Sequence, residues 1–167
     1  GVSTFVGEDT DFTIGGDFID TLTSGSALDL RFSANGTVNV GGDFLVGGAG
    51  GTNSAMSVST TDTNFIVGGD FVMELGDPST MTTDSLRTNF QIGGDLVRRT
   101  SGTVGGSTDV HALDLCTINT GGSFIIEGID LDASSTTVTM ERITFDIGED
   151  FRASHSGNLD LAGVRDT

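Results

Sequence analysis

The sequence predicts an all-β fold, a parallel β-helix of about six coils that forms one solenoid domain over residues 1–167. Three observations lead to this prediction. A short word built around Gly-Gly-Asp-Phe returns about every 26 residues, apolar residues alternate on both sides of it, and no helical period persists. A β-sandwich would explain many short strands, but not one word at nearly constant spacing. Because strand crossovers strongly prefer one hand, we expect a right-handed coil.

The repeated word predicts one strand on each side of its glycine pair. Its second glycine falls at Gly16, Gly42, Gly69, Gly94 and Gly122, and Glu149 takes this place in the sixth copy. Apolar residues flank the pair with a period of two, which is typical of strands with one buried face. We expect the following residues to fill the core: Phe12, Ile14, Phe18; Val38, Val40, Phe44; Phe65, Val67, Phe71; Phe90, Ile92, Leu96; Phe145, Ile147 and Phe151.

A further strand is predicted between successive words. It reads ALDL from Ala27, AMSV from Ala55, ALDL from Ala112, TVTM from Thr137 and LDL from Leu159. Its alternation places three pairs on the buried side: Leu28 with Leu30, Met56 with Val58, and Leu113 with Leu115. The polar insertions beside these strands vary in length, as loops on the flank of a solenoid do.

The acid of the word is predicted to form an outward column, because stacking repeats equivalent residues about 4.8 Å apart. Carboxylates at that spacing repel, so each must either accept a backbone N–H or share a Ca²⁺ ion, which prefers several oxygen ligands. The sequence leaves both alternatives open, and Ca²⁺ is the cofactor it suggests. We expect Gly15 and its equivalents to adopt positive φ at a corner. The column consists of Asp17, Asp43, Asp70, Asp95 and Asp150, interrupted by Ser123.

An apolar column follows the acids two residues later. If the strand continues without a bend, these side chains form an exposed ridge suited to an interface, and if the glycine pair bends the strand, they turn inward. The sequence does not decide between the two. The column consists of Ile19, Leu45, Val72, Val97 and Ile125, with Arg152 in the sixth copy.

Charge and composition exclude several classes of partner. Seven basic residues, all arginine, stand against 24 acidic ones, which gives a net charge of −17. Nucleic acids and anionic membranes are recognised by basic clusters, so we expect neither partner. No apolar stretch has the roughly 20 residues that a transmembrane helix needs.

The sequence does not indicate an enzyme. His111 and His155 lack a second ligand at zinc spacing and are expected at the surface, and Cys116 is expected to be an inert thiol in a strand. A polysaccharide lyase needs positive groups, whereas Lys, Trp and Tyr are absent here. A glycan-binding or polysaccharide-cleaving β-helix remains the alternative. An ice-binding face is not expected, because the threonines do not follow the repeat.

The Gly-Gly-Asp-Phe words, the Thr-, Ser-, Asn- and Gly-rich loops, the near absence of Cys and the absence of Lys together resemble secreted bacterial β-solenoids. These are the filamentous-haemagglutinin-like adhesins and the autotransporter passenger domains. The resemblance covers the whole chain, although the repeat is longer than the haemagglutinin unit. It implies exposure outside the cell and a role in adhesion or surface structure, and it carries over no binding or catalytic residue.

We therefore expect an extracellular structural solenoid at the cell surface, a self-associating or serial unit of a surface fibre, matrix filament or adhesin. Open solenoid ends present unpaired strand edges, which favour association end to end, and the ridge favours lateral association. Glycans are the other partner considered. Because the chain starts with Gly1 rather than Met, we also expect it to be processed or part of a longer protein.

Overall fold

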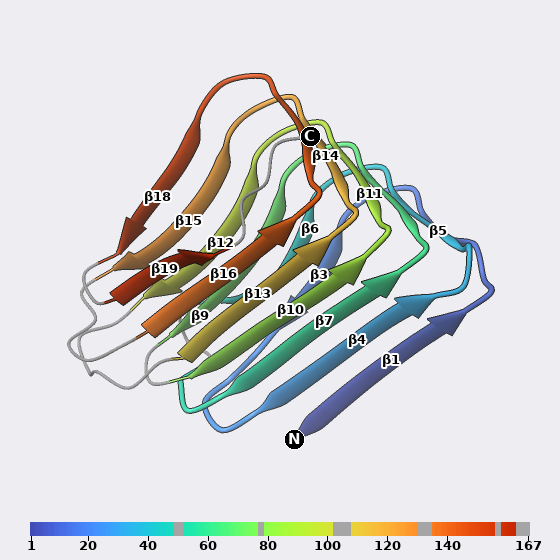
Figure 1. Ribbon diagram of the computed structural model, residues 1–167. Helices are drawn as coiled ribbons and strands as arrows, with labels where there is room; N and C mark the ends of the chain where they lie inside the picture. Colours follow the sequence, from blue (N-terminus) through green and yellow to red (C-terminus); the bar gives the residue numbers. More distant parts are fainter. Residues whose placement is uncertain (49–51, 77–78, 102–107, 130–134, 156–157, 163–167) are drawn as a thin grey trace.

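Each coil of the chain contributes one strand to each of three parallel sheets, and this arrangement confirms the predicted β-solenoid (Figure 1). The computed structural model describes residues 1–48, 52–76, 79–101, 108–129, 135–155 and 158–162. All regular elements in these ranges are strands. Six coils of three strands are followed by one further strand. Equivalent residues lie 25 to 28 positions apart in the six coils and 23 positions apart between the last strand and its neighbour.

The strands of each sheet follow one another in coil order. Sheet A contains β1 (Val2–Glu8), β4 (Ala27–Ser33), β7 (Ala55–Thr61), β10 (Thr80–Leu86), β13 (Thr108–Asp114), β16 (Ser135–Glu141) and β19 (Asn158–Ala162). Sheet B contains β2 (Phe12–Ile14), β5 (Thr37–Val40), β8 (Asn64–Val67), β11 (Asn89–Ile92), β14 (Thr117–Thr120) and β17 (Thr144–Ile147). Sheet C contains β3 (Phe18–Thr21), β6 (Phe44–Gly48), β9 (Phe71–Gly76), β12 (Leu96–Ser101), β15 (Phe124–Ile129) and β18 (Phe151–His155).

The core is a set of stacked apolar columns inside the three sheets. Phe18, Phe44 and Phe71 stack nearly parallel, with ring centroids 4.6 and 4.9 Å apart, and Phe65 meets the Phe71 ring edge-on at 5.3 Å. Stacking at the coil spacing suits aromatic rings, because offset pairs are favoured at these distances. The predicted core residues of the central coils are buried as expected, whereas Phe145 and Phe151 in the sixth coil remain 38% and 46% exposed.

The corner between sheets A and B is held in a left-handed conformation by residues other than glycine. Positive φ occurs at this corner in every coil, at Asp9, Ala34, Asp62, Arg87, Leu115 and Arg142. Leu115, predicted on the buried side, therefore turns outward and is 42% exposed, while Leu113 is buried. The period-two pattern ends at the corner, which is why the prediction for Leu115 is wrong.

Ion pairs reinforce this corner along the solenoid axis. Arg87 binds Asp62 of the preceding coil through two N–H···O contacts of 2.5 and 2.7 Å, and Arg142 binds Asp114 in the same way. The Arg87 guanidinium lowers the pKa of the Asp62 carboxyl, chiefly through these hydrogen bonds. The pairs are exposed, so solvent screens them and each contributes little to stability.

Candidate functional site

The carboxylates of the Gly-Gly-Asp words connect each coil to the next one. The N–H of Asp43 donates to Asp17 Oδ1 at 2.9 Å, and the N–H of Asp70 donates to Asp43 Oδ1 at 2.9 Å. The same bond joins Asp95 N–H to Asp70 Oδ1 at 2.8 Å and Ser123 N–H to Asp95 Oδ1 at 2.6 Å. Backbone N–H groups therefore hold the acid column, but they come from the following coil rather than from a local turn.

This arrangement explains the second glycine of each word. A Cβ placed on Gly69 would lie 1.9 Å from Asp43 Oδ1, and one on Gly94 would lie 2.0 Å from Asp70 Oδ1. The first glycine is confined by backbone, since a Cβ on Gly93 would lie 2.1 Å from the carbonyl oxygen of Gly68. Neither glycine of the described words has positive φ, so the expectation for Gly15 and its equivalents is wrong. Close approach of the preceding coil, not backbone conformation, requires glycine here.

The sixth copy of the word lacks the second glycine, and it follows the one copy that lacks the acid. Ser123 replaces the acid in the fifth coil, and in the following coil Glu149 replaces the second glycine. The Ser123 hydroxyl lies 3.4 Å from Glu149 Oε2. Where no carboxylate projects over the next coil, that coil no longer needs glycine.

The first copy of the word is different, because no described coil precedes it. A Cβ on Gly15 or Gly16 would meet no atom within 4 Å. Within the described chain this glycine pair therefore has no steric cause, although the sequence keeps it. The strands β1, β2 and β3 form the outer edges of their sheets at the same end.

The structure does not test the prediction that calcium binds the acid column, and it remains a prediction. One oxygen of each of Asp17, Asp43, Asp70 and Asp95 is engaged by a backbone N–H, and Asp150 Oδ2 binds Arg152 at 2.6 Å. Among the described residues, no three His, Cys, Asp or Glu side chains are grouped to hold a metal ion.

The predicted apolar ridge lies on the outer face of sheet C. The chain bends at the glycine pair, where sheet B ends and sheet C begins, but the bend does not turn the column inward: Phe44 points inward and Leu45 outward. Exposure along the ridge is uneven, from 62% at Ile19 to 7% at Val97. Leu45, Val72 and Ile125 are half-buried. That the ridge forms an interface stays a prediction.

The interior between the fourth and fifth coils contains polar side chains that the sequence did not lead us to expect. Arg98 is 2% exposed, and its Nε and Nη1 atoms have no hydrogen-bond partner. Its guanidinium carbon lies 5.9 Å from the centre of the Phe124 ring. Burial lowers the pKa of Arg98 to about 10.

His111 lies in the same interior, contrary to the expectation of a surface position. It is 1% exposed, and its Nδ1 lies 2.9 Å from the Thr83 hydroxyl. Burial, with a smaller contribution from Arg98, moves the pKa of His111 well below its usual value. The side chain of His155 is outside the described part of the structure.

Cys116 occupies the corner position that Thr63 and Thr88 take in earlier coils, not a strand as predicted. All three point inward and contact a carbonyl two residues earlier; the Cys116 Sγ lies 3.3 Å from the Asp114 oxygen. Burial raises the pKa of the Cys116 thiol, which suits the inert role predicted for it.

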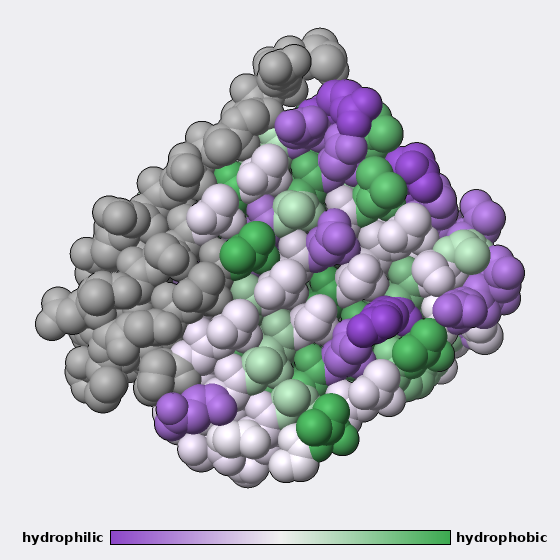
Figure 2. Space-filling view, turned by 60° about the horizontal axis from the view of Figure 1, so that its bottom comes forward, coloured by the Kyte–Doolittle hydropathy of each residue, from purple (hydrophilic) through white to green (hydrophobic). Residues whose placement is uncertain are grey.

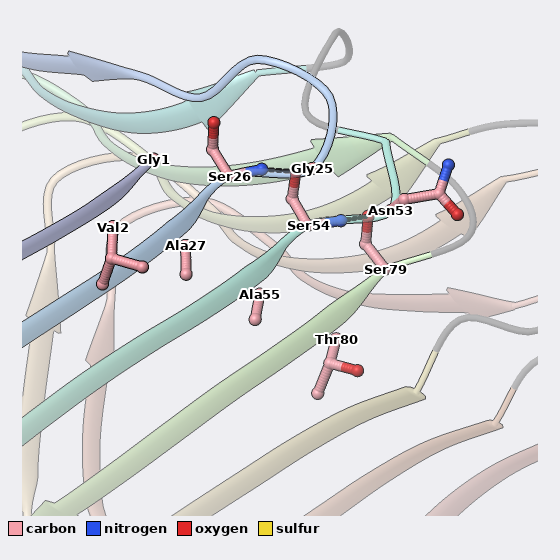
Figure 3. A pocket seen from close by; sticks show the side chains of 10 residues that line it. All are labelled: Gly1, Val2, Gly25, Ser26, Ala27, Asn53, Ser54, Ala55, Ser79 and Thr80. Carbon is pink, nitrogen blue, oxygen red and sulfur yellow. Dashed lines mark hydrogen bonds between the residues drawn. The ribbon is translucent and has the colours of Figure 1, made fainter.

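A shallow open depression of about 470 Å³ lies where the strands of sheet A begin (Figure 3). Its lining comes from four consecutive coils and consists of small residues, and the Ser54 and Ser79 hydroxyls accept backbone N–H bonds from the preceding coil. The lining contains neither a carboxylate nor an aromatic ring: Gly1, Val2, Gly25, Ser26, Ala27, Asn53, Ser54, Ala55, Ser79 and Thr80.

Comparisons with protein-family models, with curated proteins and with solved structures gave no match. Within the described ranges there is no helix that is both long and apolar enough to cross a membrane.

Proposed function

We propose that this chain is a structural β-solenoid that acts outside the cell as a self-associating or serial unit of a surface fibre, matrix filament or adhesin. The observation that carries the proposal is the Gly15–Gly16 pair. In the later coils the same pair makes room for the glycine carbonyl and, where present, the acid of the coil before it. The first coil has this room ready, next to three strand edges that no described strand pairs with.

The interior at this end supports the same proposal. Phe5, Phe12 and Phe18 are only partly buried, although their equivalents in the next coils are covered on both sides. A further coil would bury these rings and complete the strand ladders. The charge of −17, without lysine, suits a soluble exposed surface.

Polysaccharide cleavage has no comparable support. The depression on sheet A has no carboxylate in its lining, and glycoside hydrolysis requires a pair of carboxyl groups facing the bond that is cleaved. We therefore retain the structural role.

Negative-stain electron microscopy of the purified chain tests the proposal, with and without millimolar Ca²⁺. We expect rods or filaments of uniform width, and their loss in chelator would assign the acid column to calcium. Gly16→Ala should abolish end-to-end growth without destabilising the isolated chain, because the added Cβ meets nothing until an acid-bearing coil stacks on it. Thr13→Ala, on the outer face of β2, is the matched control. Discrete particles under every condition would refute self-assembly.

A further inference from the structure

The outer face of sheet A is broad and mixes polar, charged and apolar residues, and no charged residue points outward from β7 near its middle (Figure 2). Pale colours of intermediate hydropathy dominate the view, with separate purple and green patches. The outward residues of β7, in the middle of the face, are Ala55, Ser57, Ser59 and Thr61. Valines on β1 and β13 are exposed: Val2 is 78%, Val6 is 52% and Val110 is 40% exposed.

One column of this face is arranged symmetrically about β7. The register places Val6, Arg31, Ser59, Asp84 and Ala112 side by side on successive strands. Reading outward from Ser59, the next residue is a cation on one side and an anion on the other, and an apolar residue follows on both sides. A two-fold axis along β7 would superpose the cation of one copy on the anion of the other.

From this pattern we infer that two copies of the chain pack face to face through sheet A, related by a two-fold axis parallel to β7. The inference rests on the proposed function and names the surface used for lateral association. The axis keeps each residue at its place along the strand and exchanges coil two with coil four and coil one with coil five. Arg31 then faces Asp84 of the second copy, and Val6 faces Ala112 of the second copy.

The charged residues of the column are available for this contact. The Arg31 side chain is 63% exposed and uses Nε and Nη2 for Asp29, at 3.1 and 2.6 Å. Asp84 is exposed and makes no ion pair within the described part of the chain. The contact would therefore give Asp84 a partner and neutralise Arg31 from a second side, twice per dimer.

The overlap is large enough for a specific dimer. Five strands of seven residues cover roughly 24 by 23 Å, or about 550 Å² for each copy. The total of about 1,100 Å² exceeds the roughly 1,000 Å² expected of a biological interface. In the column two residues nearer the strand starts, Val110 would face Thr4 of the second copy, between its Val2 and Val6, and Asp29 would face Thr82. In the column two residues nearer the corner, Glu8 would face Asp114 of the second copy, whose carboxylate Arg142 already binds.

Sedimentation equilibrium of charge-reversed variants tests the inference. Arg31→Asp and Asp84→Arg should each weaken the dimer at least about tenfold, because each variant creates two like-charge contacts, and the double variant should restore the dimer. Arg152→Asp is the control: this arginine also pairs with an acid two residues earlier and is 61% exposed, but it lies on sheet C. Thermal unfolding of each variant shows whether the fold is intact.

Crosslinking gives a second, independent result. With Ser59→Cys, a short bifunctional thiol reagent should join two copies, because this residue lies on the axis and the native Cys116 is buried. Thr139→Cys, in the same column but on β16 beyond the overlap, should not be joined. A dimer that ignores both charge reversals, or equal crosslinking at the two positions, overturns this face while leaving self-association standing. A monomer at every concentration overturns this dimer, and the micrographs then decide end-to-end assembly separately.

Discussion

The strongest prediction concerns one substitution made at two equivalent positions, Gly94→Ala and Gly16→Ala. At Gly94 the added Cβ would lie 2.0 Å from Asp70 Oδ1 and 3.1 Å from its Cγ, so the carboxylate must move. That carboxylate accepts the Asp95 N–H at 2.8 Å, and moving it breaks the bond. A hydrogen bond to a charged group contributes about 1.5–3 kcal/mol to stability. At Gly16 the same Cβ meets nothing within 4 Å.

The comparison removes most of the unfolded-state contribution. Replacing glycine by alanine restricts the unfolded chain equally at both positions, which is worth about 0.4–1 kcal/mol. We therefore expect Gly94→Ala to lower the free energy of unfolding by about 2 kcal/mol, and Gly16→Ala to leave it unchanged or raise it slightly. Urea unfolding followed by far-ultraviolet circular dichroism measures both.

A second substitution identifies the cause. In an Asp70→Ser background the carboxylate is gone, as it naturally is at Ser123, so Gly94→Ala should cost little more. The double-mutant cycle should give a coupling energy of about 2 kcal/mol between the two sites. Equal effects at Gly16 and Gly94, or strictly additive effects of the two substitutions, would refute the steric account of the word.

Three further predictions concern the interior and the corner. Arg98→Met should stabilise the chain by up to about 3 kcal/mol, because the folded-state pKa near 10 lies below the usual 12.5 and the buried cation is unfavourable at neutral pH. Met should fit at this position, since the neighbouring residues of the column are Met73 and Ile126. A lower free energy of unfolding in urea would contradict the expectation. His111 has its folded-state pKa well below the unfolded value of 6.5, because burial disfavours the charged ring. Protons therefore favour the unfolded chain, and stability should fall as pH decreases below 6.5. His111→Met should remove this part of the slope in unfolding curves recorded from pH 7 to pH 5, and an unchanged slope would show that His111 takes up its proton in the fold. Leu115→Asn should raise the melting temperature, since Asn adopts a φ near the observed 53° at a cost about 0.5–1 kcal/mol lower than Leu does. A lower melting temperature would mean that packing of the exposed leucine side chain stabilises the fold.

The repeat made most of the fold predictable. Every coil must stack on similar coils, so one pattern repeated six times determines strands, spacing and core columns together. One coil suggested that the second glycine leaves room for a neighbouring side chain or a bend, but it did not identify the atoms that require the pair, because these atoms belong to the coil before it. A signal was nevertheless present in the sequence, since loss of the acid at Ser123 is followed one repeat later by loss of glycine at Glu149.

The remaining differences come from weighting residue type above pattern. Alternation places Arg98 in the column of Val46, Met73 and Ile126, and His111 in the column of Val58 and Val138, so both point inward. The polarity of His111 suggested the surface instead, and no position was predicted for Arg98. Leu115 shows the reverse error, because an apolar side chain at a left-handed corner leaves the alternating pattern and faces solvent.

The bond from each acid to the next coil has a direction, and this gives the solenoid a polarity for growth. A carboxylate such as that of Asp43 acts only on the coil that follows it in the chain, never on the one before. A coil that has already formed thus presents both the acceptor and the steric template for its successor. Such a chain can form one coil at a time in the direction from its N-terminus to its C-terminus. Whole coils can be duplicated or removed wherever an acid still precedes a glycine pair.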